Sequence, residues 1–317
     1  MKKLMTGNEA LARGAYEAGV KVATGYPGTP SSEILENIVQ YKEIYAEWST
    51  NEKVATEAAI GAAYAGQRSI TTMKQVGMNV AADAFFFAVY TGMRAGLVIV
   101  VADDPGMFSS QNEQDNRHYA PFAKMPLLEP SDSQEAKDFV KIALEMSEEW
   151  DVPVLYRTCM RVAHSASPVE IGERNWDDEK IPEKWVRDQD KYVCSAMLAK
   201  KKRPMIEDRL IKLVDVSNKI SINRLEWGDR KLGIIASGPV YHYAREIFPN
   251  ATFLKLGMTY PLPEGLIREL AAGVDQVMVI EELDPFIEQQ VKAMGINCIG
   301  KDIFPRYGEL LTGDIER

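Results

Sequence analysis

The sequence predicts an α/β protein with two parallel-sheet layered domains. Segments with a helical period alternate with short β-branched runs up to about Ser165, and the same alternation resumes at Leu232. The run Leu97 to Ala102 (LVIVVA) is apolar throughout, as expected of a strand that is covered on both faces. In between, the apolar periodicity fades while charge and proline content rise. The expected divisions are a first domain at 1–167, a partly helical connector at 168–230 and a smaller second domain at 231–317.

Local signals place the elements of the first domain. The segment Thr6 to Glu9 (TGNE) has the form of a capping box, which opens a helix to about Ala18, and Gly19 ends that helix. The remaining elements alternate, with strands expected at 20–24, 43–48, 69–73, 97–102 and 152–157, and helices near 31, at 52–65, at 79–90 and at 134–149. In the second domain, the strand-like runs LGIIASG, ATFLKLG and VDQVMVIEE are each followed by a helix-like run.

The composition excludes several classes of protein. A net charge of -9 argues against a nucleic-acid partner, so we expect the basic run Lys200 to Arg203 to be a solvated face. The longest apolar stretch, Ala81 to Val89, is too short to cross a bilayer, and no apolar signal region opens the chain, so we expect no membrane contact and a cytoplasmic location. The cysteines and histidines show neither a CxxC pair nor metal-ligand spacing, so we expect no metal site on this chain.

The first candidate for function is a carboxylate at the start of an Ala/Gly-rich helix. Glu52 stands near the start of the run Asn51 to Gly66 (NEKVATEAAIGAAYAG). A glutamate in the first turn of a helix can simply complement the helix dipole. The composition alone does not decide between that interpretation and a catalytic one.

Three further segments combine turn residues with polar side chains. Gly25 to Glu33 (GYPGTPSSE) is a strand end, a tight turn and a helix start with hydroxyl caps. Thr71 to Asn79 (TTMKQVGMN) is a strand, a glycine turn and a helix start, and core packing explains it equally well. Asp103 to Arg117 is a long polar loop after the LVIVVA strand, either solvated or part of the ligand crevice that forms at the carboxyl ends of parallel strands.

Taken together, these segments resemble the 2-oxoacid:ferredoxin oxidoreductases, and in particular the indolepyruvate type. The resemblance is carried by the N-terminal pattern GNEALARGAYEAGVKVATGYPGTPSSE, by NE followed by the Ala/Gly helix, and by SSQNEQD. FLKLGMTYPLP and VIEELDPFIE extend it to nearly the whole chain. It implies a thiamine diphosphate pyrimidine-binding-type fold followed by a smaller transketolase-C-terminal-like domain.

The resemblance also implies roles for individual residues. Glu52 would hydrogen-bond the aminopyrimidine ring of thiamine diphosphate and drive it into its imino form, and Thr29 would be a hydroxyl donor to substrate and cofactor. Pyruvate-type enzymes place an arginine just after the LVIVVA strand, where this chain has Asp104, which argues against pyruvate as substrate. The remaining candidates are Gln111, Asn112 and Arg117 for the substrate carboxylate, and Gln75, Gly77 and Asn79 for the cofactor.

The resemblance further implies that this chain holds only half of a site. The family binds the diphosphate and Mg²⁺ through a GDG-type turn, and no GDG occurs here. We therefore expect a fragment or an α-type subunit whose partner chain or missing segment supplies diphosphate binding, Mg²⁺ and iron–sulfur clusters, in a homo- or hetero-oligomer. Because such a site forms between two chains, we expect an exposed apolar face around the helix at Asn79.

The expected activity is oxidative decarboxylation of an aryl 2-oxoacid to an acyl-coenzyme A with reduction of ferredoxin. One alternative is a non-oxidative thiamine enzyme subunit, which would keep Glu52 but use no electron acceptor. Another is a catalytically silent scaffold subunit, against which the intact Glu52 and Thr29 count. A nicotinamide-binding Rossmann protein is disfavoured because no GxGxxG follows a predicted strand.

Overall fold

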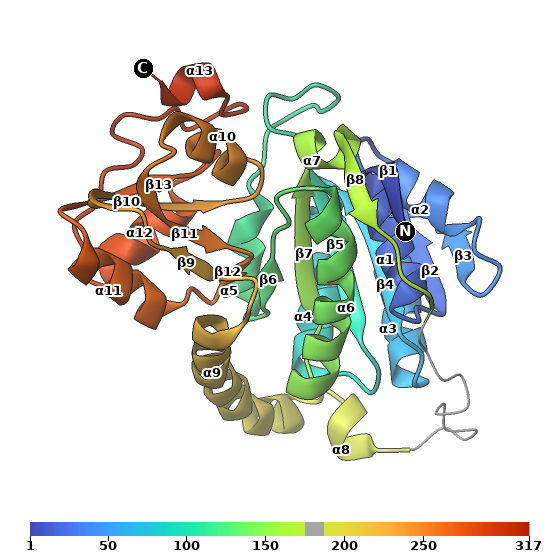
Figure 1. Ribbon diagram of the computed structural model, residues 1–317. Helices are drawn as coiled ribbons and strands as arrows, with labels where there is room; N and C mark the ends of the chain where they lie inside the picture. Colours follow the sequence, from blue (N-terminus) through green and yellow to red (C-terminus); the bar gives the residue numbers. More distant parts are fainter. Residues whose placement is uncertain (175–186, 317) are drawn as a thin grey trace.

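The computed structural model describes residues 1–174 and 187–316, which form two α/β units lying side by side (Figure 1). The larger unit is built on a seven-stranded sheet with the order β12-β6-β7-β5-β4-β2-β3. Its strand pairs are parallel except for β12 with β6, so the prediction of a layered α/β fold is confirmed. The strands are β2 (Val22–Gly25), β3 (Tyr45–Trp48), β4 (Ser69–Lys74), β5 (Leu97–Asp103), β6 (Leu127–Leu128), β7 (Val154–Cys159) and β12 (Met258–Tyr260).

Helices cover both faces of this sheet. One face packs on α1 (Gly7–Glu17), α2 (Ser32–Ile38) and α6 (Ser133–Trp150), and the other on α3 (Glu52–Tyr64), α4 (Gly77–Thr91) and α5 (Tyr119–Ala123). The central strand β5 is buried along its whole length, with Val98 and Val100 in one core and Ile99 and Val101 in the other. This alternation is the period of two expected of a strand covered on both faces.

The N-terminal elements follow the predicted capping chemistry. The Glu9 amide donates to the Thr6 hydroxyl at 3.2 Å, and the Thr6 amide donates to the Glu9 carboxylate at 2.8 Å, so the capping box is confirmed. Gly19, just after α1, has a φ of 79°. Ahead of this helix, β1 (Lys2–Thr6) pairs antiparallel with β8 (Ala166–Glu170), a small sheet that the sequence patterns did not predict.

The smaller unit has a four-stranded sheet with the order β13-β10-β11-β9. Its strands are β9 (Arg224–Glu226), β10 (Asp229–Ser237), β11 (Ala251–Leu256) and β13 (Gln276–Ile280), and its helices are α10 (Val240–Ile247), α11 (Glu264–Gly273), α12 (Phe286–Ala293) and α13 (Thr312–Ile315). The chain does not stay within this unit, because β12, directly after β11, pairs with β6 at the edge of the larger sheet.

Between the two units the chain forms α7 (Met160–His164), β8, α8 (Gln189–Tyr192) and the 24-residue helix α9 (Ala196–Lys219). Asp177 to Pro182, part of the predicted connector, lies outside the described residues. Helix α9 packs against α4 and α11 (Figure 1). Its first turns contain the basic run Lys200 to Arg203. Among the described residues, no helix has both the length and the apolar composition to cross a membrane.

Candidate functional site

The predicted site residues gather at one edge of the larger sheet. Thr29 follows the carboxyl end of β2, Glu52 follows β3, and Gln75 and Gly77 follow β4. The polar loop with Gln111 and Asn112 follows β5. These four strands are neighbours in the sheet, and ligands of open parallel sheets bind outside the carboxyl ends of the strands.

Glu52 is the first residue of α3 and is only 9% exposed. The preceding residue, Asn51, caps the helix by accepting the amide of Val54 at 3.0 Å. The start of α3 is anchored to β2, because the Thr24 hydroxyl donates to the Ala55 carbonyl at 2.7 Å. Glu52 therefore sits on a rigid helix start rather than on a mobile loop.

The Glu52 carboxylate lies against the first residue of α4. A Cβ atom added at Gly77 would be 2.7 Å from Glu52 Oε1, so only glycine leaves room for the carboxylate there. Within the described chain, the structure gives this carboxylate no hydrogen bond and no ion pair. Neither oxygen is among the fully buried polar atoms that lack a partner, so the carboxylate of this largely buried residue keeps some contact with solvent and is an acceptor available to a donor on a bound group. The residues therefore fit a ring that brings a hydrogen-bond donor to this edge of the sheet.

The turn that carries Thr29 is organised by its own serines. The Gly28 amide donates to Ser32 Oγ at 2.8 Å, and the Ser31 hydroxyl donates to the Gly28 carbonyl at 2.7 Å. Thr29 is half-buried, and its hydroxyl makes no hydrogen bond to any described residue. The turn thus presents a free hydroxyl group near the candidate site while its serines hold the backbone.

Both ends of the Gln75 side-chain amide form hydrogen bonds with the loop after β5. Its Oε1 accepts the Asp104 amide at 2.9 Å, and its Nε2 donates to the Asn112 carbonyl at 2.6 Å. The side chain is completely buried. Its geometry therefore supports a positioning role, in which Gln75 holds Asn112 over the end of β4, more than direct contact with a cofactor.

Asn79 on α4 and the loop residues Gln111 and Asn112 are exposed. Asn79 donates to Gln114 Oε1 at 3.1 Å and accepts the Tyr119 hydroxyl at 2.6 Å, which ties α4 to the loop. Gln111 and Asn112 face solvent. Asn112 also accepts Gln114 Nε2 at 3.0 Å through its side chain. The amides of Gln111 and Asn112 lie where a substrate could reach them.

Asp104, the residue in place of the pyruvate-type arginine, is buried and shapes the loop. Its carboxylate accepts the amides of Phe108 at 3.2 Å and Ser109 at 2.8 Å and the hydroxyl of Ser110 at 2.5 Å. It therefore closes a turn and does not present a charge to a ligand.

Lys74, the last residue of β4, lies at the same edge of the sheet and was not singled out by the sequence patterns. Its Cβ would be 2.8 Å from a Cβ added at Gly28, and its Nζ donates to the Ser109 carbonyl. Lys74 thus lies between the Thr29 turn and the β5 loop, with ammonium donors left over for a ligand. The available signal was its place as the last residue of a strand next to β2.

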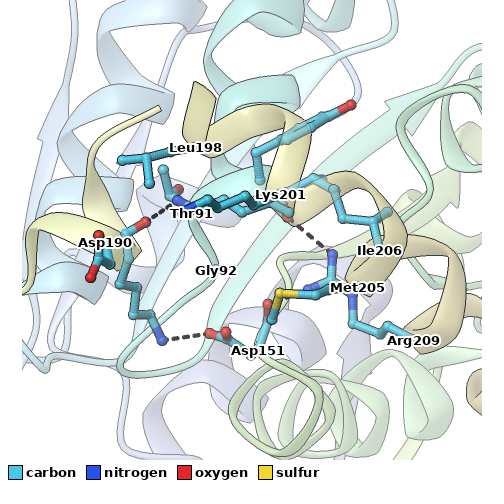
Figure 2. Close-up of a pocket in the computed structure, with 13 residues that line it drawn as sticks. Thr91, Gly92, Asp151, Asp190, Leu198, Lys201, Met205, Ile206 and Arg209 are labelled. Carbon is cyan, nitrogen blue, oxygen red and sulfur yellow. Dashed lines mark hydrogen bonds and ion pairs between the residues drawn. The ribbon is translucent and has the colours of Figure 1, made fainter. Parts of the chain in front are cut away.

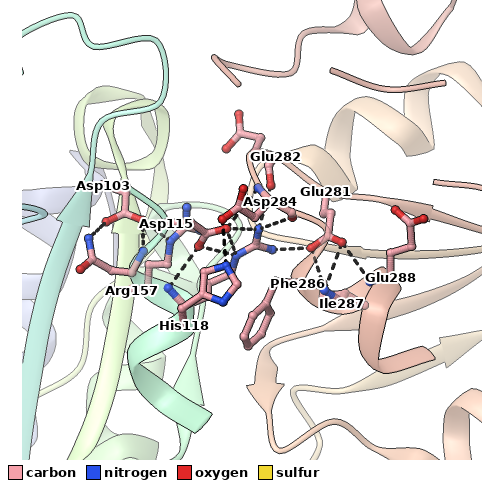
Figure 3. Close-up of polar contacts among 12 residues, drawn as sticks. Asp103, Asp115, His118, Arg157, Glu281, Glu282, Asp284, Phe286, Ile287 and Glu288 are labelled. Carbon is pink, nitrogen blue, oxygen red and sulfur yellow. Dashed lines mark hydrogen bonds and ion pairs between the residues drawn. The ribbon is translucent and has the colours of Figure 1, made fainter. Parts of the chain in front are cut away.

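Arg117 occupies a different environment from the one we expected. Its side chain is 2% exposed and pairs with Asp115 of the larger unit and Glu281 of the smaller one, two residues that Figure 3 shows on either side of the contact between the units. The Nη2 atom bonds Asp115 at 2.6 Å, and the Nη1 atom bonds Glu281 at 2.6 Å. The Nη2 atom also donates to the carbonyls of Glu282 and Asp284. Because every edge of the guanidinium is engaged, the geometry argues against Arg117 as a ligand for a substrate carboxylate and gives it a structural role.

Burial and charge shift the acidity of groups around Arg117. The guanidinium holds the pKa of Asp115 well below its usual range, against the opposing effect of burial. Burial raises the pKa of Glu282 to about 7, and the amide of Leu310 is its hydrogen-bond donor at 3.1 Å. Asp115, His118 and Asp284 also bring ligand atoms within 4.8 Å of one another, but Asp115 is committed to Arg117.

Comparison with known proteins shows the family to which the chain belongs. A family profile described as "Pyruvate flavodoxin/ferredoxin oxidoreductase, thiamine diP-bdg" matches residues 13–217. The proteins named "Indolepyruvate oxidoreductase subunit IorA" from Archaeoglobus fulgidus and Pyrococcus horikoshii are 44% and 42% identical to this chain. These matches cover 93% and 98% of this chain but 49% and 51% of the relatives, so the chain spans about half the length of the relatives it matches.

Solved structures show the same fold at much lower identity. A 2-oxoglutarate:ferredoxin oxidoreductase from Magnetococcus marinus matches with a TM-score of 0.79 at 16% identity, over 99% of this chain and 64% of that one. A split gene transketolase, described as an inactive β4 tetramer, matches with a TM-score of 0.63 at 15% identity, over 98% and 96% of the two chains. By the profile that spans residues 13–217 and by its IorA relatives, the chain belongs to the pyruvate flavodoxin/ferredoxin oxidoreductase family, of which it carries the thiamine diphosphate-binding domain.

Proposed function

We propose that this chain is the pyrimidine-binding half of a thiamine diphosphate-dependent 2-oxoacid:ferredoxin oxidoreductase that converts an aryl 2-oxoacid to an acyl-coenzyme A. The observation that carries the proposal is the largely buried Glu52, whose carboxylate has no partner among the described residues and lies against Gly77. Thiamine diphosphate, when bound, supplies the carbanion chemistry, while the protein supplies orientation and electrostatics.

Each residue at the sheet edge has a part in this proposal. Glu52 would accept a hydrogen bond from the pyrimidine ring and hold the proton there. Thr29 would donate its hydroxyl to the substrate. The substrate carboxylate would meet Lys74 together with the amides of Gln111 and Asn112, since Arg117 is fully engaged elsewhere.

The substrate class rests on two observations. Asp104 closes a turn in the position where a pyruvate-type enzyme would present an arginine, so small 2-oxoacids lose that contact. The relatives at 41–46% identity are named for indolepyruvate. We therefore favour an aryl side chain on the 2-oxoacid.

A partner chain or further segment is part of the proposal. Glu52 starts α3 and lies against the start of α4, and α4 in turn packs on α5; these helices expose Val54, Val80, Phe87 and Phe122, and Phe122 is 72% exposed. Large apolar side chains exposed on neighbouring helices are in keeping with a protein interface. We propose that the diphosphate-binding element with Mg²⁺, and the iron–sulfur clusters that reduce ferredoxin, meet the chain on this face. Cys159, Cys194 and Cys298 are unpaired, in keeping with a reducing cytoplasm.

The test compares Glu52→Gln with the wild type in the native complex, purified with its partner. The assay is substrate- and coenzyme-A-dependent reduction of a viologen dye, and gel filtration reports assembly. We expect activity to fall at least about a hundredfold, in the range for loss of a general acid–base group, with assembly intact. Glu36→Gln, which changes an exposed glutamate on α2, is the matched control and should retain activity.

The other outcomes distinguish the alternatives. Equal activity in the two Glu52 forms would remove the proposed role and leave a structural subunit. Substrate-dependent CO₂ release without viologen reduction, lost in Glu52→Gln, would identify a non-oxidative thiamine enzyme. Reduction of the dye with pyruvate in preference to aryl 2-oxoacids would overturn the substrate assignment alone.

A further inference from the structure

A pocket of about 470 Å³ opens between α4, α8 and α9 (Figure 2). It is lined by the last turn of α4, by Asp151 after α6 and by the first half of α9. The ends of α4 and α6 lead into the amino ends of β5 and β7, so the pocket lies at the opposite edge of the sheet from Glu52. It is therefore separate from the candidate site, and its volume lies in the range of small-molecule sites.

The lining carries more positive than negative charge, although the chain as a whole has a net charge of -9. One of its two carboxylates, Asp151, is already paired with Lys191 at 2.8 Å. The three remaining cations, Lys201, Lys202 and Arg209, form no ion pair with any described residue.

Arg209 shows most clearly that positive charge is left over. Its two terminal nitrogens donate to the carbonyls of Asp151 at 2.7 Å and Val89 at 3.0 Å, which are neutral acceptors. Its Nε atom is buried without a hydrogen-bond partner in the described chain. Burial lowers the pKa of this guanidinium, and the carboxylate of Asp151 offsets that effect only in part. A buried donor of this kind gains when an acceptor arrives.

The rest of the lining is apolar. Val89 and Ile206 are buried, Tyr90 and Leu198 are half-buried, and Met205 is exposed. Met205 is 67% exposed, so its apolar surface is open to a ligand in the pocket. The lining thus combines an apolar wall with excess cationic donors.

We infer that this pocket binds a small amphipathic anion, a carboxylate, sulfonate or phosphate group carried on an apolar body. The apolar body packs on Leu198, Met205 and Ile206, and the anionic group meets Lys201 and Arg209. The basic run Lys200 to Arg203 then has a use beyond solubility, since two of its members line the pocket. This inference does not depend on the proposed function, because none of its residues belongs to the Glu52 edge.

Two dyes that differ in one charged group test the inference on the full chain. The sulfonate 8-anilinonaphthalene-1-sulfonate and its uncharged analogue N-phenyl-1-naphthylamine are titrated by fluorescence. We expect the sulfonate to bind about tenfold more tightly than the uncharged dye, equivalent to about 1.4 kcal/mol for the ionic contact. In Lys201→Glu this preference should disappear, and in Met205→Glu both dyes should weaken.

Matched controls come from the same helix. Lys212 and Ile211 are exposed on α9 but do not line the pocket, so Lys212→Glu and Ile211→Glu should leave both titrations within about twofold of the wild type. All four substitutions fall at exposed positions, and circular dichroism checks that each variant is folded.

Two results would overturn the inference. One is equal affinity for the charged and uncharged dyes in the wild type, which would show that the pocket does not select anions. The other is sulfonate binding that survives Lys201→Glu and Met205→Glu but falls in Phe122→Asp, which would place the dye on the apolar face of α3, α4 and α5.

Discussion

Replacing Arg117 with methionine should destabilise the protein far more than the same change at an exposed arginine. The side chains of Arg117 and its partners Asp115 and Glu281 are all at most 2% exposed. Methionine can fill much of the space but leaves two buried carboxylates without their cation. Removing one partner of a buried ion pair costs roughly 3–5 kcal/mol. Glu281 keeps the amides of Ile287 and Glu288 as donors, so we expect a loss of about 3–4 kcal/mol in the free energy of unfolding.

The loss is measured by urea unfolding followed by tryptophan fluorescence. The control is Arg268→Met, which breaks an exposed pair with Glu264 and should change the free energy of unfolding by less than about 0.5 kcal/mol. Arg117 lowers the pKa of Asp115, so the native wild type keeps that carboxylate charged. In the variant its pKa rises, and protonation relieves the buried charge, so the deficit should shrink as pH falls from 7 to 5. A loss below about 1 kcal/mol at pH 7 would refute the reasoning.

Gly77→Ala should displace the Glu52 carboxylate, because the added Cβ would lie 2.7 Å from Oε1, and should weaken thiamine diphosphate binding to the complex at least about tenfold by fluorescence titration. Unchanged affinity would show that the carboxylate is not where the cofactor binds. Glu282→Gln should stabilise the protein by about 3 kcal/mol above pH 7 but not below pH 4.5, because burial raises the native pKa from 4.5 to about 7 and the wild type loses stability across that window. Parallel pH profiles of the urea midpoint for wild type and variant would contradict this. Lys74→Met should raise the KM for a 2-oxoacid about tenfold or more with a smaller change in kcat, whereas an unchanged KM would exclude Lys74 from carboxylate binding.

The elements with strong local signals were predictable from the sequence. The capping box at Thr6 and the fully apolar run of β5 depend only on residues close together in the sequence. The predicted helix start and the predicted buried strand are both confirmed. Helix α4 begins at Gly77, two residues before the predicted start, because no polar side chain caps it and the sequence gives no N-cap signal. The short strands β6 and β12 were missed, since two- and three-residue strands form only through pairing across a long sequence separation.

The candidate site was predictable only in part, and the reason is physical. Glu52, Thr29 and Gln75 follow strand ends, and parallel strands bring such ends to one edge, so their proximity follows from the fold class. Arg117 lies in the same polar loop, and nothing local distinguishes it from a ligand-binding arginine. Its partner Glu281 is 164 residues away, on the other α/β unit. A buried long-range ion pair leaves no periodic trace in the sequence, so its role emerges only from the assembled structure.

The ion cluster around Arg117 links the second α/β unit to the candidate site. Asp103 is the last residue of β5, and its carboxylate accepts the amide of Asn116, so both ends of the loop from Asp103 to Arg117 are fixed. Gln75 holds the middle of that loop from the opposite side. The loop that carries Gln111 and Asn112 is thus clamped between β4 and the second unit. The second unit therefore has a part in shaping the substrate side of the site, and loosening this contact through Arg117→Met should disturb substrate binding before cofactor binding.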